Sequence, residues 1–229
     1  MSRRPKRPGN PVRSMEQPFI FSAASYLTRI TNQRAHSIAE LAAAIADCSD
    51  ASIFHHTFQT LGQHHFLTEG FSNDFAQWAL ASANRVELAE QLGALDIRDY
   101  VSLAELRTDL RRIVLTYGDA HPEAAGQLAL EPLYFCESVE VVVPLGVQAA
   151  SLEDFRTALD RLSHDSLYYH FIASRLRLQL RTNDFSLWFA NVLGLTNLAN
   201  LVNRIDIYTN TLDGARRAIA RLVDLEIVR

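Results

Sequence analysis

One block of residues occurs twice in this chain, and this repetition constrains the fold more than any other feature. Its first copy runs from a serine–histidine segment into an Asn-Asp-Phe-x-x-Trp segment, and its second copy repeats both. The matched residues are Ser52, His56, Asn73, Asp74, Phe75 and Trp78, with Ser166, His170, Asn183, Asp184, Phe185 and Trp188. The histidines lie 114 residues apart and the chain's two tryptophans 110 apart. Solenoid units run to roughly 20–50 residues, so this longer period indicates a duplicated domain.

Apolar residues at helical spacing follow residues that favour helix starts in both copies. Ser37 and Ser151 precede one such segment, Asn73 and Asn183 a second, and Ser102 and Thr211 a third. Ser37 and Glu40 have the spacing of a capping box. Only residues 19–30 and 133–143 have strand character, and Val139–Val143 is the best strand candidate.

We therefore predict an all-α protein of two tandem, pseudo-twofold-related helical repeats of about five helices each, with short extended arms. The predicted boundaries are a disordered basic N-terminal arm at 1–18, a first repeat at 19–117, a linker at 118–132 and a second repeat at 133–229. Gly118, Pro122, Gly126 and Pro132 mark the linker.

Charge is unevenly distributed along the chain. Five of the 22 basic residues and none of the 26 acidic residues lie in the first 13 positions, so the rest has 17 basic against 26 acidic residues. An acidic body argues against nucleic-acid binding, and only the basic arm has the charge for it. No apolar stretch approaches the roughly 20 residues of a membrane span. Two cysteines without metal spacing fit a cytoplasmic protein with inert thiols.

With these matched blocks, the chain resembles an uncharacterised bacterial and archaeal family of duplicated helical domains, known only as a domain of unknown function. The resemblance spans roughly residues 19–229 and includes Leu88-Ala89 and Leu198-Ala199. It brings no established activity. Some relatives are encoded beside, or labelled as, sugar-processing enzymes, which is an association of neighbourhood and not of chemistry.

The repeated histidines and aspartates are the first candidates for a site. His56, His170, Asp74 and Asp184 at the seam between the copies would offer a transition metal two imidazoles and two carboxylates, and the first copy adds His64 and His65. No HExxH or ExxH pattern is present. We therefore favour structural histidines, each bonded to a carbonyl or to a capping aspartate, and predict no metal and no cofactor.

Three other residue types have both a structural and a functional interpretation. Ser52 and Ser166 precede their histidines by four residues, but no nucleophile-elbow motif is present, so helix capping is favoured over catalysis. Trp78 and Trp188 could stack on a sugar ring, yet packing in the core or between the copies is the plainer interpretation. Arg177 and Arg181, at i and i+4, could clamp a phosphate or carboxylate, or pair with the acidic body.

These observations favour a non-catalytic helical binding or scaffold protein. It would hold a protein partner or small ligand at the seam or in a groove beside the histidine helices. The candidate ligand-binding residues are His56, His170, Asp74, Asp184, Trp78, Trp188, Arg177 and Arg181. The alternative is an enzyme or accessory factor of carbohydrate metabolism with a His/Asp site between the repeats. An enzyme requires the four His and Asp residues to converge on a pocket, whereas a scaffold requires them buried, with an apolar patch exposed elsewhere.

Overall fold

The computed structural model describes residues 17–60 and 71–229 of the chain. Most of the predicted basic arm lies outside these described residues, as do His64 and His65.

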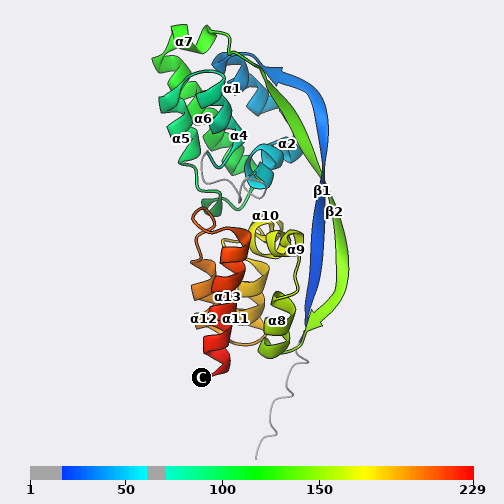
Figure 1. Cartoon of the computed structure of the whole chain (residues 1–229). Coiled ribbons are helices and arrows are strands. Elements are labelled where there is room, and N and C mark those ends of the chain that lie inside the picture. Colours follow the sequence, from blue (N-terminus) through cyan, green and yellow to red (C-terminus); the bar gives the residue numbers. More distant parts are fainter. Residues whose placement is uncertain (1–16, 61–70) are drawn as a thin grey trace, which may run out of the picture.

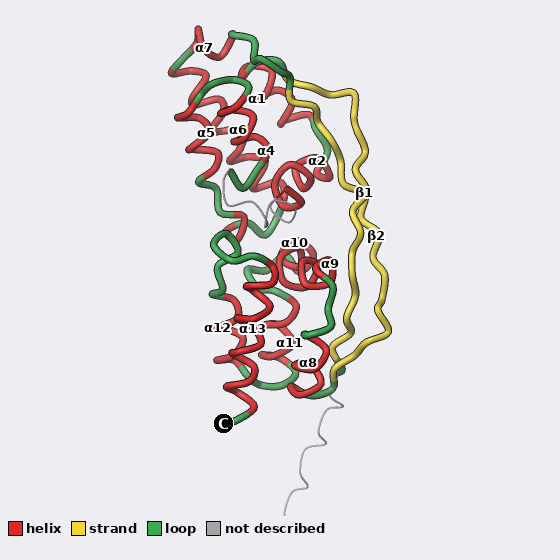
Figure 2. Tube along the Cα trace, in the orientation of Figure 1, coloured by secondary structure: helices red, strands yellow, loops and turns green. Residues whose placement is uncertain are grey.

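Two helical lobes lie end to end along one long β-ribbon (Figures 1 and 2). The ribbon consists of β1 (Phe19–Ala35) and β2 (Leu133–Ala149), which pair antiparallel, with Tyr26 opposite Glu140. Lobe A contains α1 (Ile38–Asp47), α2 (Asp50–Phe54), a π-helix η1 (His55–Gln59), α4 (Asp74–Ala81), α5 (Val86–Gly93), a 3-10 turn η2 (Ile97–Asp99), α6 (Leu103–Ala120) and α7 (Pro122–Gly126). Lobe B contains α8 (Leu152–Leu159), α9 (His164–Tyr168), a π-helix η3 (Tyr169–Ala173), α10 (Ser174–Leu178), α11 (Asp184–Asn191), α12 (Thr196–Asn203) and α13 (Leu212–Ile227).

The ribbon shows that the all-α prediction is wrong. The two predicted arms extend to 17 residues each and pair with each other over most of their length. They also exchange lobes. β1 begins in lobe B, where the ring of Phe19 lies 5.7 Å from that of Trp188, and ends beside α1 of lobe A. β2 begins in lobe A, where Phe135 lies 5.6 Å from His56. Neither half of the sequence therefore forms a self-contained helical repeat.

The predicted helix starts are confirmed by capping hydrogen bonds. The side chains of Ser37, Asn73 and Ser102 each accept a bond from the backbone N–H three residues later, and Ser151, Asn183 and Thr211 do the same. The prediction that Ser52 and Ser166 cap helices is wrong, because Ser49 and Ser163 are the N-cap residues of α2 and α9. The Ser166 hydroxyl instead donates to the carbonyl oxygen of Ser22 at 2.7 Å and so attaches β1 to lobe B.

Phenylalanine dominates the core of both lobes. Seven phenylalanine side chains have no exposed surface at all: Phe21, Phe58, Phe75, Phe135, Phe155, Phe185 and Phe189. Two of them, Phe21 and Phe135, come from the first residues of the strands, so each strand end is a core segment of the lobe that receives it. An isolated two-stranded ribbon is only marginally stable in water. Burial of these phenylalanine side chains in the lobes supplies the additional stability that the ribbon needs.

The middle of the ribbon is covered on one face only. Helices lie on one side of the ribbon (Figures 1 and 2). Leu27, Val139, Val141 and Val143 are 43–59% exposed. Their positions alternate with those of Tyr26, which packs against Phe54 of α2, and of Glu140, so they lie on the other face. Leu27 pairs with Val139 across the strands, so these side chains form one apolar outer face. In the described part of the chain, no helix is both long enough and apolar enough to cross a bilayer.

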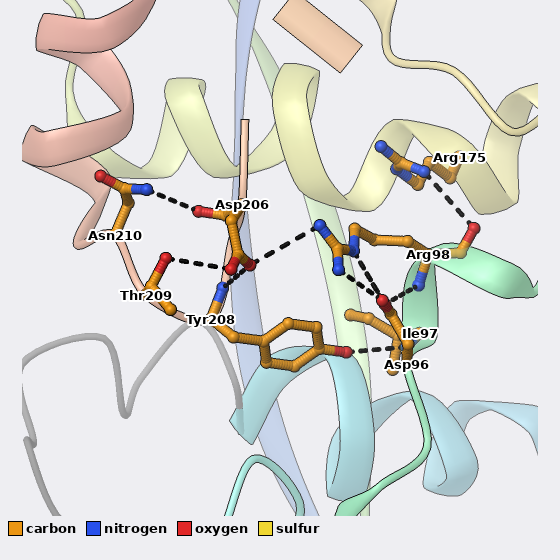
Figure 3. A network of polar contacts seen from close by, with 8 residues as sticks. All are labelled: Asp96, Ile97, Arg98, Arg175, Asp206, Tyr208, Thr209 and Asn210. Atoms are coloured by element: carbon orange, nitrogen blue, oxygen red, sulfur yellow. Dashed lines mark hydrogen bonds and ion pairs between the residues drawn. The ribbon is translucent and has the colours of Figure 1, made fainter. Parts of the chain in front are cut away.

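Away from the ribbon, the lobes meet in a polar network around Arg98 (Figure 3). Arg98 pairs with Asp96 of its own lobe and, at 3.6 Å, with Asp206 of lobe B, and its guanidinium lies 5.4 Å from the ring centre of Tyr208. The Tyr208 hydroxyl accepts a hydrogen bond from the Ile97 N–H at 2.8 Å. Burial alone would raise the pKa of Asp96, but its hydrogen bonds from Arg98 hold that pKa below its ordinary value. The network therefore closes the seam on the side opposite the ribbon.

Candidate functional site

His56 joins three segments of lobe A. The side chain, in the π-helical turn η1, is almost fully buried. Its Nδ1 lies 2.8 Å from an Asp74 carboxylate oxygen at the start of α4, and its Nε2 accepts a hydrogen bond from the backbone N–H of Cys136 on β2 at 3.0 Å. Because a backbone N–H can only donate, Nε2 is the unprotonated nitrogen and Nδ1 carries the hydrogen that Asp74 accepts. Both ring nitrogens are thus engaged in holding β2 to lobe A.

His170 makes the same contacts in lobe B. Its Nδ1 lies 2.6 Å from Asp184 at the start of α11, and its Nε2 accepts a hydrogen bond from the backbone N–H of Ser22 on β1 at 2.8 Å. The ring packs edge-on against Phe19, 4.9 Å between centroids. We call each histidine–aspartate–strand unit a histidine clamp: His56, Asp74 and Cys136 in lobe A, and His170, Asp184 and Ser22 in lobe B.

The two clamps lie far apart along the ribbon. Cys136 pairs with Ile30 of β1, eight residues from Ser22, and eight residues of strand span roughly 26 Å. The structure therefore brings His56 together with Asp74, and His170 together with Asp184, but it does not assemble the four into one site.

Each tryptophan also fixes the chain just before a strand. The indole Nε1 of Trp78 donates to the carbonyl oxygen of Glu131 at 2.8 Å, and that of Trp188 donates to the carbonyl oxygen of Gln17 at 3.0 Å. Both side chains are 6% exposed, so neither offers a ring face to a sugar. Each lobe thus fastens its incoming strand with one imidazole and one indole.

His55, His56 and Asp74 form a group that could hold a metal ion, since their ligand atoms lie within 4.8 Å of one another. Each of these groups already has a partner. His55 Nδ1 lies 3.0 Å from the Ser138 hydroxyl, and His56 and Asp74 form the clamp. Binding through His56 would displace either the Cys136 N–H or Asp74, so these residues fit the clamp better than a metal ion.

The two arginines are separated by the end of their helix. α10 ends at Leu178 because Gln179 adopts a left-handed conformation, with φ of 52°, so Arg181 lies in the following loop and the predicted i,i+4 pair does not form. Arg177 forms an ion pair with Asp184, and its guanidinium lies over the ring of Tyr169 at 4.0 Å. Arg181 is exposed and has no hydrogen bond or ion pair with any described residue.

A cleft of about 400 Å³ opens between the lobes beneath the middle of the ribbon. We call it the lobe cleft. Both strands and both lobes line it, chiefly through Tyr26, Glu140, Phe54, Leu103, Leu176 and Arg177. The Tyr26 hydroxyl donates a hydrogen bond to Glu140 at 2.8 Å, and the Tyr26 ring packs against that of Phe54, 5.3 Å between ring centres.

Apart from Arg177, no predicted site residue lines this cleft. Four of the other five, Tyr26, Glu140, Phe54 and Leu176, differ from their counterparts in the other copy, so a search for repeated residues does not find them.

The comparisons place this fold among known proteins. Residues 16–224 match the family described as "Family of unknown function (DUF5752)", and the chain belongs to that family. A solved structure, reported as "The structure of OrfY from Thermoproteus tenax", is similar at 28% sequence identity and a TM-score of 0.81. The similarity covers 94% of this chain and 98% of that one, so the two proteins share the whole architecture. No curated protein matches the chain.

Proposed function

We propose that this protein is a non-catalytic binding protein that holds a small molecule in the lobe cleft. The observation that carries this proposal is the cleft itself, which brings together apolar, aromatic and charged side chains from both lobes and both strands. Pockets of 300–1,000 Å³ that are mainly apolar, with a few convergent polar groups, are typical ligand sites. A ligand held there would contact both lobes at once and stabilise their arrangement.

The histidine clamps support a non-catalytic role. A general base or a metal ligand needs a ring nitrogen free to face a substrate or ion. His56 and His170 each use Nε2 for a strand N–H and Nδ1 for a carboxylate. The carbohydrate-enzyme alternative needed their convergence with Asp74 and Asp184 on one pocket, and no observation favours it.

Internal duplication followed by divergence accounts for where the cleft lies. The clamp histidines, their aspartates and the tryptophans are identical in the two halves and make equivalent contacts. At the same 114-residue offset, Tyr26 corresponds to Glu140 and His55 to Tyr169. The residues that are identical in the two halves hold the strands, while residues that differ between the halves line or flank the lobe cleft. Divergence at this place supports a binding site that only the fused, asymmetric chain possesses.

We place the protein in a reducing compartment such as the cytoplasm. Its two cysteines are unpaired, Cys48 buried and Cys136 half-buried. Burial raises the pKa of both thiols, and for Cys136 the nearby Asp74 adds to the effect. Thiols of raised pKa form little thiolate and react slowly, which supports a structural role.

A screen against a blocked cleft tests the proposal. Ala51 lines the cleft and is partly exposed, so Ala51→Trp should fill it, whereas Ala39→Trp on the exposed face of α1 is the matched control. A library of small metabolites is screened by thermal shift on the wild type and both variants. We expect compounds that raise the melting temperature of the wild type and of Ala39→Trp but not of Ala51→Trp. If every stabilising compound acts equally on all three proteins, or none acts on any, the proposal fails.

A further inference from the structure

We propose that the ligand of the lobe cleft is a small zwitterion of the amino-acid class, with its ammonium group at Glu140 and its carboxylate at Arg177. This inference rests on the binding function proposed above and goes further by naming the chemistry. It follows from two opposite charges that line one cleft without pairing with each other.

Glu140 supplies the site for the cation. One carboxylate oxygen accepts the hydrogen bond from the Tyr26 hydroxyl at 2.8 Å, and the other has no partner among the described residues. Tyr26 is itself held between Phe54 and Tyr168, with ring centres 5.3 and 5.8 Å away. The carboxylate is therefore fixed in position beside aromatic rings, and an ammonium group there gains both an ion pair and contacts with ring faces.

Arg177 supplies the site for the anion. Asp184 holds one terminal nitrogen, and the ring of Tyr169 supports the guanidinium plane. A guanidinium has five N–H donors in a planar fork, so most of them remain for a carboxylate. Asp184 also accepts a hydrogen bond from His170, so it does not serve Arg177 alone. The lobe B clamp thus fixes the direction of Arg177 while leaving donors available.

The separation of these two charges decides between ligand classes. Among the described residues, Glu140 and Arg177 line the same cleft but form no ion pair or hydrogen bond with each other. A ligand with a single charge would desolvate either the second Glu140 oxygen or the remaining Arg177 donors without giving them a partner, which is costly for a charged group. A zwitterion compensates both. Leu103 and Leu176 line the same cleft, so an apolar side chain on the ligand would also be covered.

Calorimetric titration of the full chain tests the inference, with the twenty amino acids as probes. The best-binding amino acid is then compared with two analogues, the amine that lacks its carboxylate and the acid that lacks its ammonium group. We expect each analogue to bind at least tenfold more weakly. Glu140→Gln should weaken amino-acid binding at least tenfold, whereas Glu90→Gln, on the exposed face of α5, should leave it unchanged. Circular dichroism verifies that both variants fold.

The outcomes distinguish a failure of the zwitterion inference from a failure of the proposed binding function. Equal binding of an analogue and its parent amino acid, or unchanged binding by a folded Glu140→Gln variant, overturns the zwitterion inference. If no amino acid binds although the metabolite screen finds a cleft ligand of another class, the zwitterion inference fails and the binding function stands. If neither experiment finds a ligand, both fail.

Discussion

The backbone N–H of Cys136 donates a hydrogen bond to Nε2 of His56, a residue 80 positions earlier in the chain. The bond fastens the beginning of strand β2 to the centre of lobe A. Truncation of this histidine leaves the strand N–H and the Asp74 carboxylate without their partner and opens a cavity next to Phe75 and Phe135.

We therefore expect His56→Ala to lower the free energy of unfolding by about 2–4 kcal/mol, and His170→Ala to do the same in lobe B. Urea denaturation measures both. His121→Ala is the control, because its partly exposed ring lies at the end of α6 and contacts no strand. Losses no larger than that of the control would show that the clamps contribute little to stability.

Stability should fall as the pH is lowered through the range in which His55 titrates. Burial, with a smaller contribution from neighbouring His56, lowers the pKa of His55 from its ordinary value of 6.5. The folded state then binds fewer protons than the unfolded state, so stability rises with pH. The contribution of neutral His55 is complete well above pH 6.5 and is lost as the pH falls through 6.5 towards the lower folded-state pKa.

Denaturation at a series of pH values between about 5 and 8 measures this effect. His55→Asn removes the titrating ring and should flatten the slope, whereas His36→Asn, on the loop before α1, should retain it. A slope unchanged by His55→Asn would assign the pH dependence to another group.

The two lobes should unfold together, because each contains a strand end from the other half of the sequence. The chain has only two tryptophans, one in each lobe, so single-tryptophan variants report on the lobes separately. Trp78→Phe leaves the reporter in lobe B and Trp188→Phe leaves the one in lobe A. Each variant loses one indole hydrogen bond and about 1 kcal/mol of stability.

Within either variant, the fluorescence transition of the remaining tryptophan should coincide with the far-ultraviolet circular dichroism transition of the whole chain. A separate transition for one lobe would mean that it remains folded without the contacts of the other.

Arg175 should be replaceable by an apolar side chain at no cost. It is 5% exposed, its Nε has no hydrogen-bond partner, and one of its terminal nitrogens donates a long bond, 3.4 Å, to the carbonyl oxygen of Arg98 (Figure 3). Burial, together with the charge of Arg98, lowers the pKa of Arg175. A buried charge without a carboxylate partner is unfavourable, so Arg175→Met should leave stability unchanged or raise it by about 1 kcal/mol.

Arg177→Met on the same helix is the contrasting variant, because it breaks the ion pair with Asp184 and should destabilise the protein. Chemical denaturation compares the two. A loss of stability in Arg175→Met would indicate that its charge is compensated after all.

The sequence revealed those parts of the fold that depend on local patterns. Caps such as Ser37 and Asn183 are local signals, and the structural interpretation of His56 and Trp78 followed from their repetition. The pairing of the arms has no local signal, because Tyr26 and Glu140 lie 114 residues apart, and Ser22, Ala23, Ala24 and Ser25 have weak strand preference. The sequence did not predict the lobe cleft for a related reason. A search for repeated residues finds what the halves share, whereas Glu140 and Arg177 belong to one half only.

The exchange of strand ends also constrains how the polypeptide can be divided. A break in the segment 127–132 would leave one fragment without the Phe135 that fills its core and the other without Phe19 and Phe21. Neither piece could fold by itself, yet each carries what the other is missing, so mixing them should restore the native particle. During synthesis, the N-terminal lobe likewise stays incomplete until the ribosome has released the start of the second strand.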